Sequence, residues 1–246
     1  MDPTRSILRG ATPRRMRAVE RGLLAEEMAS FIRHELRNKF TSMKAAMFLL
    51  KRRAKEEGMP EDGRTLQLCD VLAGEVGKAN DLLGTVPPIA IARRFERVTA
   101  QACLEHATDR TGLPKGVRLE VAAVPEGLEV DVDAAEVVVA IRNVVDNAVE
   151  AVGDRGLVKV TGCVRGGTFV VDVHDDAGGI PETARSDAMR AFYTTKDGHA
   201  GMGLNVARRA TERYGGDVVI GNDDGATVVE LSFPAAEIGK AGAPVR

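Results

Sequence analysis

The chain contains 246 residues with a formal net charge of −2, 44% hydrophobic residues, no Trp and three separated cysteines. This balance gives no overall attraction to nucleic acid or to membranes, and no stretch approaches the ~18 apolar residues of a membrane-spanning helix. We therefore expect no membrane insertion and no nucleic-acid partner. An odd number of scattered cysteines fits neither a disulfide framework nor a metal site, so we also expect a cytoplasmic protein.

The N-terminal segment, residues 1–24, is strongly basic. Six arginines lie before residue 22, against Asp2 and Glu20. Solvated basic ends of this kind are common, so we interpret the segment as a partly disordered start of the chain. Binding of nucleic acid or lipid by this segment is the less favoured alternative.

Two amphipathic helical patterns come next. The first runs from about Pro13 to Glu57 without an internal proline and stops at Gly58, and the second ends near Gly84. Both repeat apolar residues at steps of three and four, close to a coiled-coil seam. One helical hairpin cannot bury the apolar seams of both its helices, whereas two hairpins can bury them in a four-helix bundle. We therefore predict that residues 25–86 form a helical hairpin that dimerises with a second copy of the chain. The seam of the first helix consists of Ile32, Leu36, Phe40, Met43, Met47 and Leu50.

His34 stands on the exposed face of this first helix. At about 100° per residue it lies roughly 160° from Leu36, so it points away from the seam. Asn38, one turn later, shares its face, and Glu35 can reach one nitrogen of the ring. A carboxylate that accepts from one imidazole nitrogen raises the basicity of the other, which suits a nucleophile for group transfer. Taken alone, a lone exposed histidine is more often an idle surface residue.

Beyond a linker at residues 87–95, which two consecutive prolines stiffen, the pattern changes to mixed α and β structure. We therefore predict an α+β protein: a helical hairpin that forms a dimeric four-helix bundle, a folded domain at residues 96–235, and a disordered tail at 236–246. Strands and helices of the domain are expected at residues 116–124, 128–133, 134–152, 157–164, 168–176, 202–216, 217–223 and 225–234.

The expected helix at 134–152 has a polar face beside its apolar one. Asn143 and Asn147 project from it four residues apart, with Glu136, Asp146 and Glu150 nearby. Asparagine is a mediocre helix former, so two of them beside acidic groups are an unusual choice for solvation alone. Amide and carboxylate oxygens suit Mg²⁺, which is often held by few protein groups together with phosphates.

Two glycine-rich turns follow along the chain. Asp175 leaves a strand and enters residues 177–179, where a glycine backbone can approach a planar ring and the carboxylate can accept from an exocyclic amine, as in adenine. Gly201 and Gly203 precede a helix, whose N-terminus attracts phosphate. Between the two turns, the segment AFYTTK (residues 191–196) is expected to form a mobile lid.

Five segments occur in a fixed order: FIRHELRN, NVVDNAVEA, DDAGGIP, FYTTK and GMGL. They resemble the H, N, G1, F and G2 boxes of two-component sensor histidine kinases, over roughly residues 25–234. The resemblance implies a dimerisation and histidine-phosphotransfer hairpin, followed by a two-layer α/β sandwich of the gyrase, chaperone, histidine-kinase and mismatch-repair superfamily. The implied cofactors are ATP and Mg²⁺, and the implied partner is a response-regulator receiver domain, which receives the phosphoryl group on an aspartate.

Individual roles follow from the same resemblance. His34 is the implied phospho-acceptor and Glu35 its base, while Asn38 is the implied helper in dephosphorylation of the partner. Asn147 is the implied Mg²⁺ ligand, and Asp175 the implied reader of adenine. The residues implied to bind the nucleotide are Asn143, Asn147, Asp175, Gly179, Thr195, Lys196, Gly201, Gly203 and Leu204.

The sequence departs from the family pattern at four positions. Lys39 stands where the H box usually has proline, so the familiar helix bend is expected to be absent. Ala177, Ala200 and Met202 replace the usual glycine, threonine and leucine. None of these changes removes a charged or metal-binding group, so we expect catalysis to survive.

Two other classes of function fit parts of the sequence. A non-catalytic phosphotransfer or scaffold protein with this architecture is the main alternative, but it would be expected to lose the asparagines and the second glycine box. An ATPase or serine-directed kinase of the superfamily would lack the hairpin that carries His34. Only about 25 residues precede the hairpin, so input is expected from an upstream sensor protein or through the N-terminal helix.

Overall fold

The chain folds into two compact units, one formed by residues 1–27 with 91–246 and the other by residues 28–90. The structure is a computed structural model, and it describes residues 8, 10–58, 63–85, 92–109, 113–122, 124–125, 127–194, 201–223, 225–234 and 238–240. Within the described part of the chain, no helix combines the length and the apolar character needed to cross a membrane.

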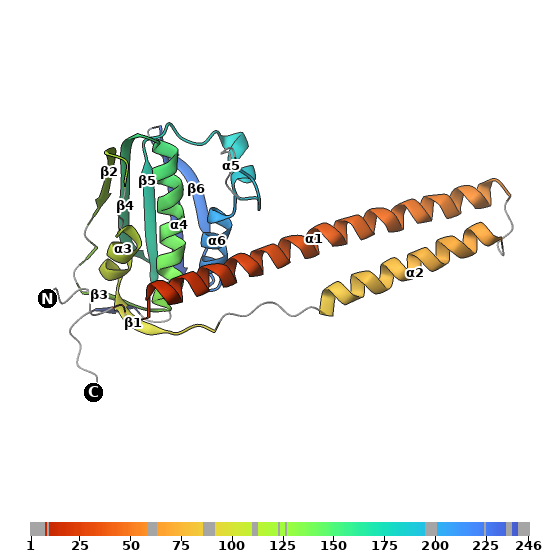
Figure 1. The fold of residues 1–246 in the computed structure, drawn as a ribbon, viewed down its shortest axis with the longest axis horizontal. Helices are drawn as coiled ribbons and strands as arrows, with labels where there is room; N and C mark the ends of the chain where they lie inside the picture. Colours follow the sequence, from red (N-terminus) through yellow and green to blue (C-terminus); the bar gives the residue numbers. More distant parts are fainter. Residues whose placement is uncertain are drawn as a thin grey trace. The chain divides into compact units, whose positions relative to one another are not determined.

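The helical unit is a hairpin. α1 (Pro13–Glu56) and α2 (Arg64–Thr85) run antiparallel in Figure 1, and Lys51 of α1 forms an ion pair with Asp70 of α2. The described α1 ends within one residue of the predicted helix and passes Lys39 without interruption, because no proline removes a backbone hydrogen bond there. The apolar side chains that are buried in the hairpin are Met47, Ala54, Leu66 and Cys69.

The α/β unit is built on a five-stranded sheet in the order β2-β4-β5-β7-β6. β2 pairs in parallel with β4, whereas the other neighbours are antiparallel. A smaller sheet has the order β1-β3-β8. The strands are β1 (Glu96–Thr99), β2 (Gly116–Val121), β3 (Leu128–Val132), β4 (Arg155–Arg165), β5 (Thr168–Asp175), β6 (Val218–Asp223), β7 (Ala226–Pro234) and β8 (Ile238–Lys240).

Three helices cover one face of the larger sheet (Figure 1). They are α3 (Ala100–Thr108), α4 (Ala134–Val152) and α6 (Gly203–Glu212), while α5 (Glu182–Ala188) lies in the connection between β5 and α6. The alternating strand residues that face these helices form the core, and the large side chains buried there include Leu104, Ile141, Phe169, Leu231 and Phe233. This helical part followed by a two-layer α/β domain confirms the predicted α+β class. Four elements, β1, α3, α5 and β8, were not predicted from the sequence.

The first turns of α1 contribute to the core of the α/β unit. Met16, Val19 and Leu23 are 6%, 0% and 0% exposed and belong to the same buried cluster as the residues of α4. Arg15 Nη2 lies 2.5 Å from Asp133 Oδ2, at the start of α4. The helix predicted from about Pro13 is therefore present, but its first turns pack into the core, whereas residues 1–24 were interpreted as a solvated, partly disordered basic segment. The buried residues Met16, Val19 and Leu23 recur at steps of three and four, and this apolar pattern lies among the arginines of the segment.

The predicted disordered tail also differs from the structure at residues 238–240. These residues form β8, whose backbone pairs with Leu128, Glu129 and Val130 of β3. β3 has β1 on its other side, so its remaining edge offers unpaired backbone groups to an extra strand. Backbone pairing of this kind leaves little signal in a sequence of small residues.

Candidate functional site

A cavity of about 640 Å³ opens in the α/β unit between α4, the turn after β5, the strand β7 and the start of α6. These elements carry the segments that resemble the N, G1 and G2 boxes, and Tyr193 and Thr194 of the segment that resembles the F box also line the cavity. Thr195 and Lys196 lie outside the described residues. The other predicted nucleotide-binding residues all line this cavity: Asn143, Asn147, Asp175, Gly179, Gly201, Gly203 and Leu204.

α4 brings two amides to the cavity. Its N-cap, Asp133, accepts a hydrogen bond from the Ala135 N–H at 3.1 Å, which fixes where the helix begins. One side-chain N–H of Asn143 donates to the Val139 carbonyl at 2.9 Å, so its amide oxygen is directed away from the helix backbone. A Cβ at Gly203 would lie 3.3 Å from the Asn147 amide and 3.4 Å from Asn143 Oδ1. The start of α6 therefore packs directly against both amides, and glycine permits this approach.

Asp175 ends β5 at the inner wall of the cavity. Its side chain is 5% exposed, and Oδ1 accepts from the Ala177 N–H at 3.1 Å. Thr227 of β7 stands directly opposite Asp175 in the antiparallel pair, is 4% exposed and also lines the cavity. Thr227 was not predicted from the sequence, because its place beside Asp175 depends on strand register rather than on a local motif. Together the two side chains offer a carboxylate and a hydroxyl to a buried ligand.

The segment before α6 is shaped by Gly201. This residue has φ +63°, and a Cβ there would lie 2.4 Å from the Tyr193 carbonyl oxygen, so a side chain would be both strained and blocked. α6 then begins at Gly203, and its N-cap residue Met202 makes no side-chain capping hydrogen bond. The first backbone N–H groups of a helix without such a cap can bind an anion.

His34 belongs to the hairpin unit and is widely accessible, with 72% of its side chain exposed. The amide of Asn38 lies 3.2 Å from Nδ1, and Glu35 Oε1 lies 4.0 Å from the same nitrogen. In the described part of the hairpin, the side-chain contacts of the ring are thus made through Nδ1. Nε2 is the nitrogen left for an incoming group.

The environment predicted for Glu136 was wrong. The residue was expected beside Asn143 and Asn147 on a polar face, but it is 0% exposed and does not line the cavity. Its carboxylate lies 3.2 Å from Arg213 Nε and 3.8 Å from Arg93 Nε. Burial raises the pKa of this carboxyl, and the two guanidinium groups oppose that shift.

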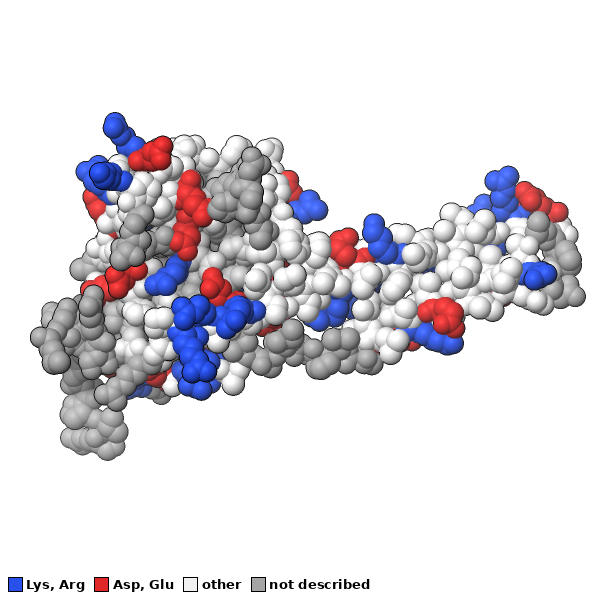
Figure 2. Space-filling model, in the orientation of Figure 1, with Lys and Arg blue, Asp and Glu red and all other residues white. Residues whose placement is uncertain are grey.

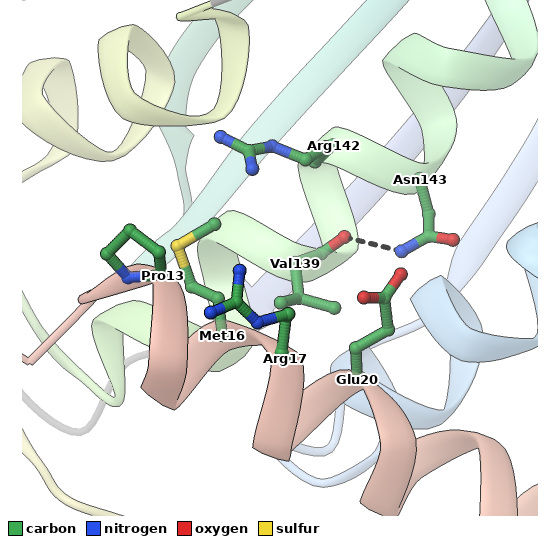
Figure 3. Close-up of a pocket in the computed structure, with 7 residues that line it drawn as sticks. All are labelled: Pro13, Met16, Arg17, Glu20, Val139, Arg142 and Asn143. Carbon is green, nitrogen blue, oxygen red and sulfur yellow. Dashed lines mark hydrogen bonds between the residues drawn. The ribbon is translucent and has the colours of Figure 1, made fainter.

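A second, smaller cavity of about 100 Å³ separates α1 from α4 (Figure 3). Asn143 borders both cavities, and in Figure 3 the carboxylate of Glu20 on α1 points towards its side chain. The α1 residues Pro13, Met16, Arg17 and Glu20 therefore line a cavity next to the candidate site, and Asn143 stands between the two cavities. No motif in the sequence indicated this, because residues 13–24 were interpreted as part of a solvated segment.

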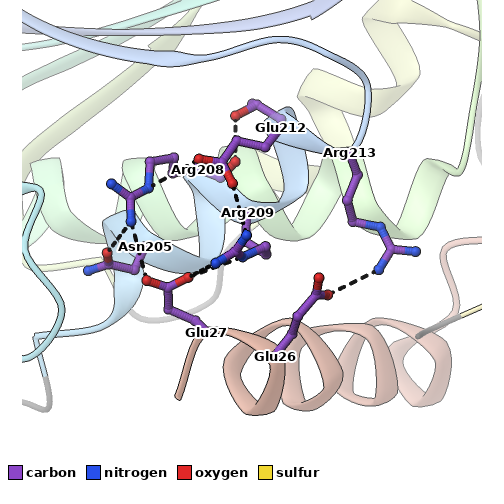
Figure 4. Close-up of polar contacts among 8 residues, drawn as sticks. Glu26, Glu27, Asn205, Arg208, Arg209, Glu212 and Arg213 are labelled. Carbon is purple, nitrogen blue, oxygen red and sulfur yellow. Dashed lines mark hydrogen bonds and ion pairs between the residues drawn. The ribbon is translucent and has the colours of Figure 1, made fainter. Parts of the chain in front are cut away.

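Ion pairs join α1 to α6 nearby (Figure 4). Glu27, only 4% exposed, accepts from Arg209 Nη2 at 2.6 Å and from Arg208 Nη2 at 3.2 Å. Arg213 Nη1 lies 3.4 Å from Glu26 Oε2. Two arginines of α6 and its C-cap residue Arg213 thus hold two consecutive glutamates of α1.

Metal binding at the cavity would rest on few protein groups. Among the described residues, no three or more His, Cys, Asp or Glu side chains stand together as a metal cluster. The cavity does offer the oxygens of Asn147, Asp146 and Glu150. This donor set fits Mg²⁺, which takes most of its remaining ligands from phosphate and water.

Comparison with known proteins finds a matching family model and similar curated proteins. Residues 132–237 match the family described as histidine kinase-, DNA gyrase B-, and HSP90-like ATPase. Sensor histidine kinase ZraS of Escherichia coli (strain K12) is 26% identical over 229 residues, which cover 90% of this chain and 47% of that protein. Sensory histidine kinase/phosphatase NtrB of Azospirillum brasilense is 26% identical over 228 residues, covering 84% and 55%. The chain spans about half the length of the curated relatives it matches.

Solved structures share the fold. A histidine kinase from Burkholderia phymatum STM815 matches with a TM-score of 0.57 at 17% identity, over 92% of this chain and 100% of that one. Full-length ShkA in complex with AMPPNP matches with a TM-score of 0.55 at 23% identity, over 89% of this chain and 47% of that one. The family model and the sequence matches to ZraS and NtrB confirm the predicted resemblance, and the solved structures show the shared fold.

Proposed function

We propose, from the premise that residues 132–237 form an ATPase domain of the histidine kinase type, that the chain is an ATP-dependent protein-histidine kinase. It would phosphorylate its own His34 and then pass the phosphoryl group to an aspartate of a response-regulator receiver domain. The observation that carries the proposal is the convergence of Asn143, Asn147 and Asp175 on one cavity in a chain that also presents an exposed His34.

The cavity supports binding of ATP through three chemically distinct walls. The Asp175 carboxylate can accept from the exocyclic amine of adenine, and the Thr227 hydroxyl beside it can donate to or accept from the ring. The first turn of α6 can bind phosphate through its backbone N–H groups. The Asn147 amide oxygen is the proposed protein ligand of Mg²⁺, with Asn143 in support. When bound, Mg²⁺ neutralises charge that develops on the phosphates.

The hairpin supports nucleophilic attack by Nε2 of His34. The new N–P bond forms as the bond from the γ-phosphorus to the bridging oxygen breaks, and ADP leaves with that oxygen. The ring then carries a surplus proton on Nδ1, and Glu35, 4.0 Å away, is placed to take it. Asn38 can hold the ring through Nδ1, since an amide can turn either its oxygen or its nitrogen towards the ring. We also assign Asn38 to the reverse reaction, in which it would orient the water that dephosphorylates the receiver.

Homodimerisation is supported by the apolar surface that the single hairpin leaves uncovered. Ile32, Leu36 and Met43 are 49%, 38% and 51% exposed, although they lie on the predicted seam. Large areas of the hairpin in Figure 2 carry no charged side chain. A second copy would bury these residues in a four-helix bundle.

Docking of a receiver domain is supported by the face of α1 that bears His34. Phe48 and Leu49 lie about 40° and 60° round the helix from His34, by the ordinary helical period. They are 66% and 58% exposed. This gives the receiver an apolar contact a few turns from the phospho-acceptor.

We place the reaction in the cytoplasm, where ATP and the proposed partner are available.

Incubation of the chain with Mg²⁺ and γ-labelled ATP tests the proposal. We expect an acid-labile, alkali-stable label that is absent from His34→Gln and kept in His174→Gln, the matched control in β5. Label that persists in His34→Gln would refute the assignment. If the wild type binds Mg·ATP in a calorimeter but takes up no label, the chain is an ATPase-type relative. If it does not bind Mg·ATP at all, the non-catalytic phosphotransfer function replaces the proposal.

A further inference from the structure

Three neighbouring strands place Asp175, Thr227 and Asn222 in one row. Thr227 of β7 pairs with Asp175 of β5 on one side and with Asn222 of β6 on the other. Directly paired residues present their side chains on the same face of a sheet, so all three face the side that the helices cover. Asp175 and Thr227 line the cavity, whereas Asn222 does not.

Asn222 instead holds the turn that follows Asp175. Its side-chain oxygen accepts from the Ile180 N–H at 3.1 Å, and its side-chain nitrogen donates to the Ile180 carbonyl at 3.0 Å. The amide therefore pairs with one residue as a neighbouring strand would, using one donor and one acceptor. Only an Asn side chain of this length supplies both groups at this position.

The other end of the turn is held in the same way. Asp176 Oδ1 accepts from the Leu157 N–H at 2.9 Å, and the Asp176 N–H donates to the Leu157 carbonyl at 3.3 Å. The turn is thus attached to β4 at its start and to β6 at its end. Between the two attachments, Ala177 and Gly179 line the cavity.

Gly179 and Asn222 also depend on each other. Gly179 has φ +80°, and a Cβ there would lie 2.8 Å from Asn222 Nδ2. A side chain at residue 179 would displace the amide that holds the turn. Residue 179 therefore favours glycine for two reasons: the positive φ, and the close approach of the Asn222 side chain.

We infer that Asn222 is a positioning residue for nucleotide binding: it fixes the Ala177–Ile180 turn against which the base would rest. The inference rests on the proposed function, since it assumes that the cavity takes ATP. Without the attachment at Ile180, the turn would sample more conformations, and binding would have to order it each time. Asn222 touches no reacting atom, so its loss should weaken ATP binding without slowing transfer at saturation.

The test compares Asn222→Ala and Asn222→Asp with Asp223→Ala, in which the neighbouring exposed side chain is removed. Calorimetry with Mg·ATP should show a Kd raised about tenfold for Asn222→Ala, from the loss of two hydrogen bonds. Asn222→Asp keeps an acceptor for the Ile180 N–H but turns an oxygen towards the Ile180 carbonyl, so it should bind no better than the alanine variant. The control should bind as the wild type does, and maximal autophosphorylation at saturating ATP should change less than twofold in all three.

Hydrogen exchange without nucleotide separates this inference from the proposed function. Amides 177–180 of Asn222→Ala should exchange faster than those of the wild type, while thermal unfolding stays unchanged because the amide is exposed. Unchanged exchange at these amides, or a Kd within twofold of the wild type, overturns the role of Asn222. A wild type that fails to bind Mg·ATP overturns the proposed function, and the inference with it, whatever the exchange shows.

Discussion

Replacement of Glu27 by alanine tests how strongly α1 is bound to the α/β unit. The carboxylate is 4% exposed and accepts from Arg209 at 2.6 and 3.1 Å and from Arg208 at 3.2 Å. With Glu27 in place, the side chains of Arg208 and Arg209 are 29% and 22% exposed, so both already reach solvent. They keep Glu212, at 3.6 and 3.1 Å, as a partner on their own helix.

The expected loss of unfolding free energy follows from these exposures. Loss of one partner from a fully buried ion pair costs about 3–5 kcal/mol, because the remaining charge stays buried without compensation. Here both arginines reach solvent and retain Glu212, so we expect about 2 kcal/mol for Glu27→Ala. Glu27→Gln keeps one acceptor oxygen and should cost about 1 kcal/mol. Glu56→Ala, which removes an exposed partner of Arg52 on the same helix, should change the value by less than about 0.5 kcal/mol.

Urea unfolding followed by tyrosine fluorescence measures this loss in the relevant unit. The chain has no Trp, and its two tyrosines, Tyr193 and Tyr214, both belong to the α/β unit. A double-mutant cycle with Arg209→Ala should give a coupling free energy of about 1 kcal/mol or more. If Glu27→Ala lies within the error of Glu56→Ala, or the cycle shows no coupling, the ion pairs do not bind α1 to α6.

Three further predictions concern a core residue, the proposed metal ligand and a buried thiol. Leu23→Ala should lower the unfolding free energy of the α/β unit by about 2–5 kcal/mol in the same urea assay, because its side chain is fully buried. Asn147→Ala should raise the Kd for ATP about tenfold or more in calorimetry with Mg²⁺ and change it little in EDTA, because the substitution removes only the proposed metal ligand. Burial raises the pKa of the Cys103 thiol to about 12. Relative to Cys103→Ala, the wild type should therefore lose stability in urea titrations between about pH 8 and about pH 10, where the unfolded thiol ionises and the folded one does not.

Helical periodicity predicted elements well but not their partners. The steps of three and four defined the extents of α1 and α4, and the order of the motifs led to Asn143, Asn147 and Asp175. Periodicity does not distinguish a polar residue that is exposed to solvent from one that is buried against an arginine. Glu136 was therefore predicted on the polar face of α4, although it is buried beside Arg213. That arginine, Arg213, lies about 77 residues further along the chain, and only the tertiary fold brings the two together.

Composition misled where charge and burial alternate along one helix. The first turns of α1 carry arginines on one side, while Met16, Val19 and Leu23 on the other side enter the core. Thr227 and Asn222 were missed for a different reason, because their relation to Asp175 arises from the pairing of β5, β6 and β7. Register of this kind is set by the whole sheet and is not written in any short segment.

α4 connects the attachment of α1 to the candidate metal ligand. At its N-terminal end the Asp133 carboxylate accepts from Arg15 of α1 at 2.5 Å and from the Arg94 N–H at 2.7 Å, and Arg15 also donates to the Ala92 carbonyl at 3.1 Å. Asn147 lies about 21 Å further along the same helix, at 1.5 Å per residue. The α/β unit is joined to the hairpin through α1 and through the segment that ends at residues 92–94, and both are fixed at Asp133. The same helix therefore has at its N-cap the residue that holds both connections, and further along it carries the candidate metal ligand Asn147.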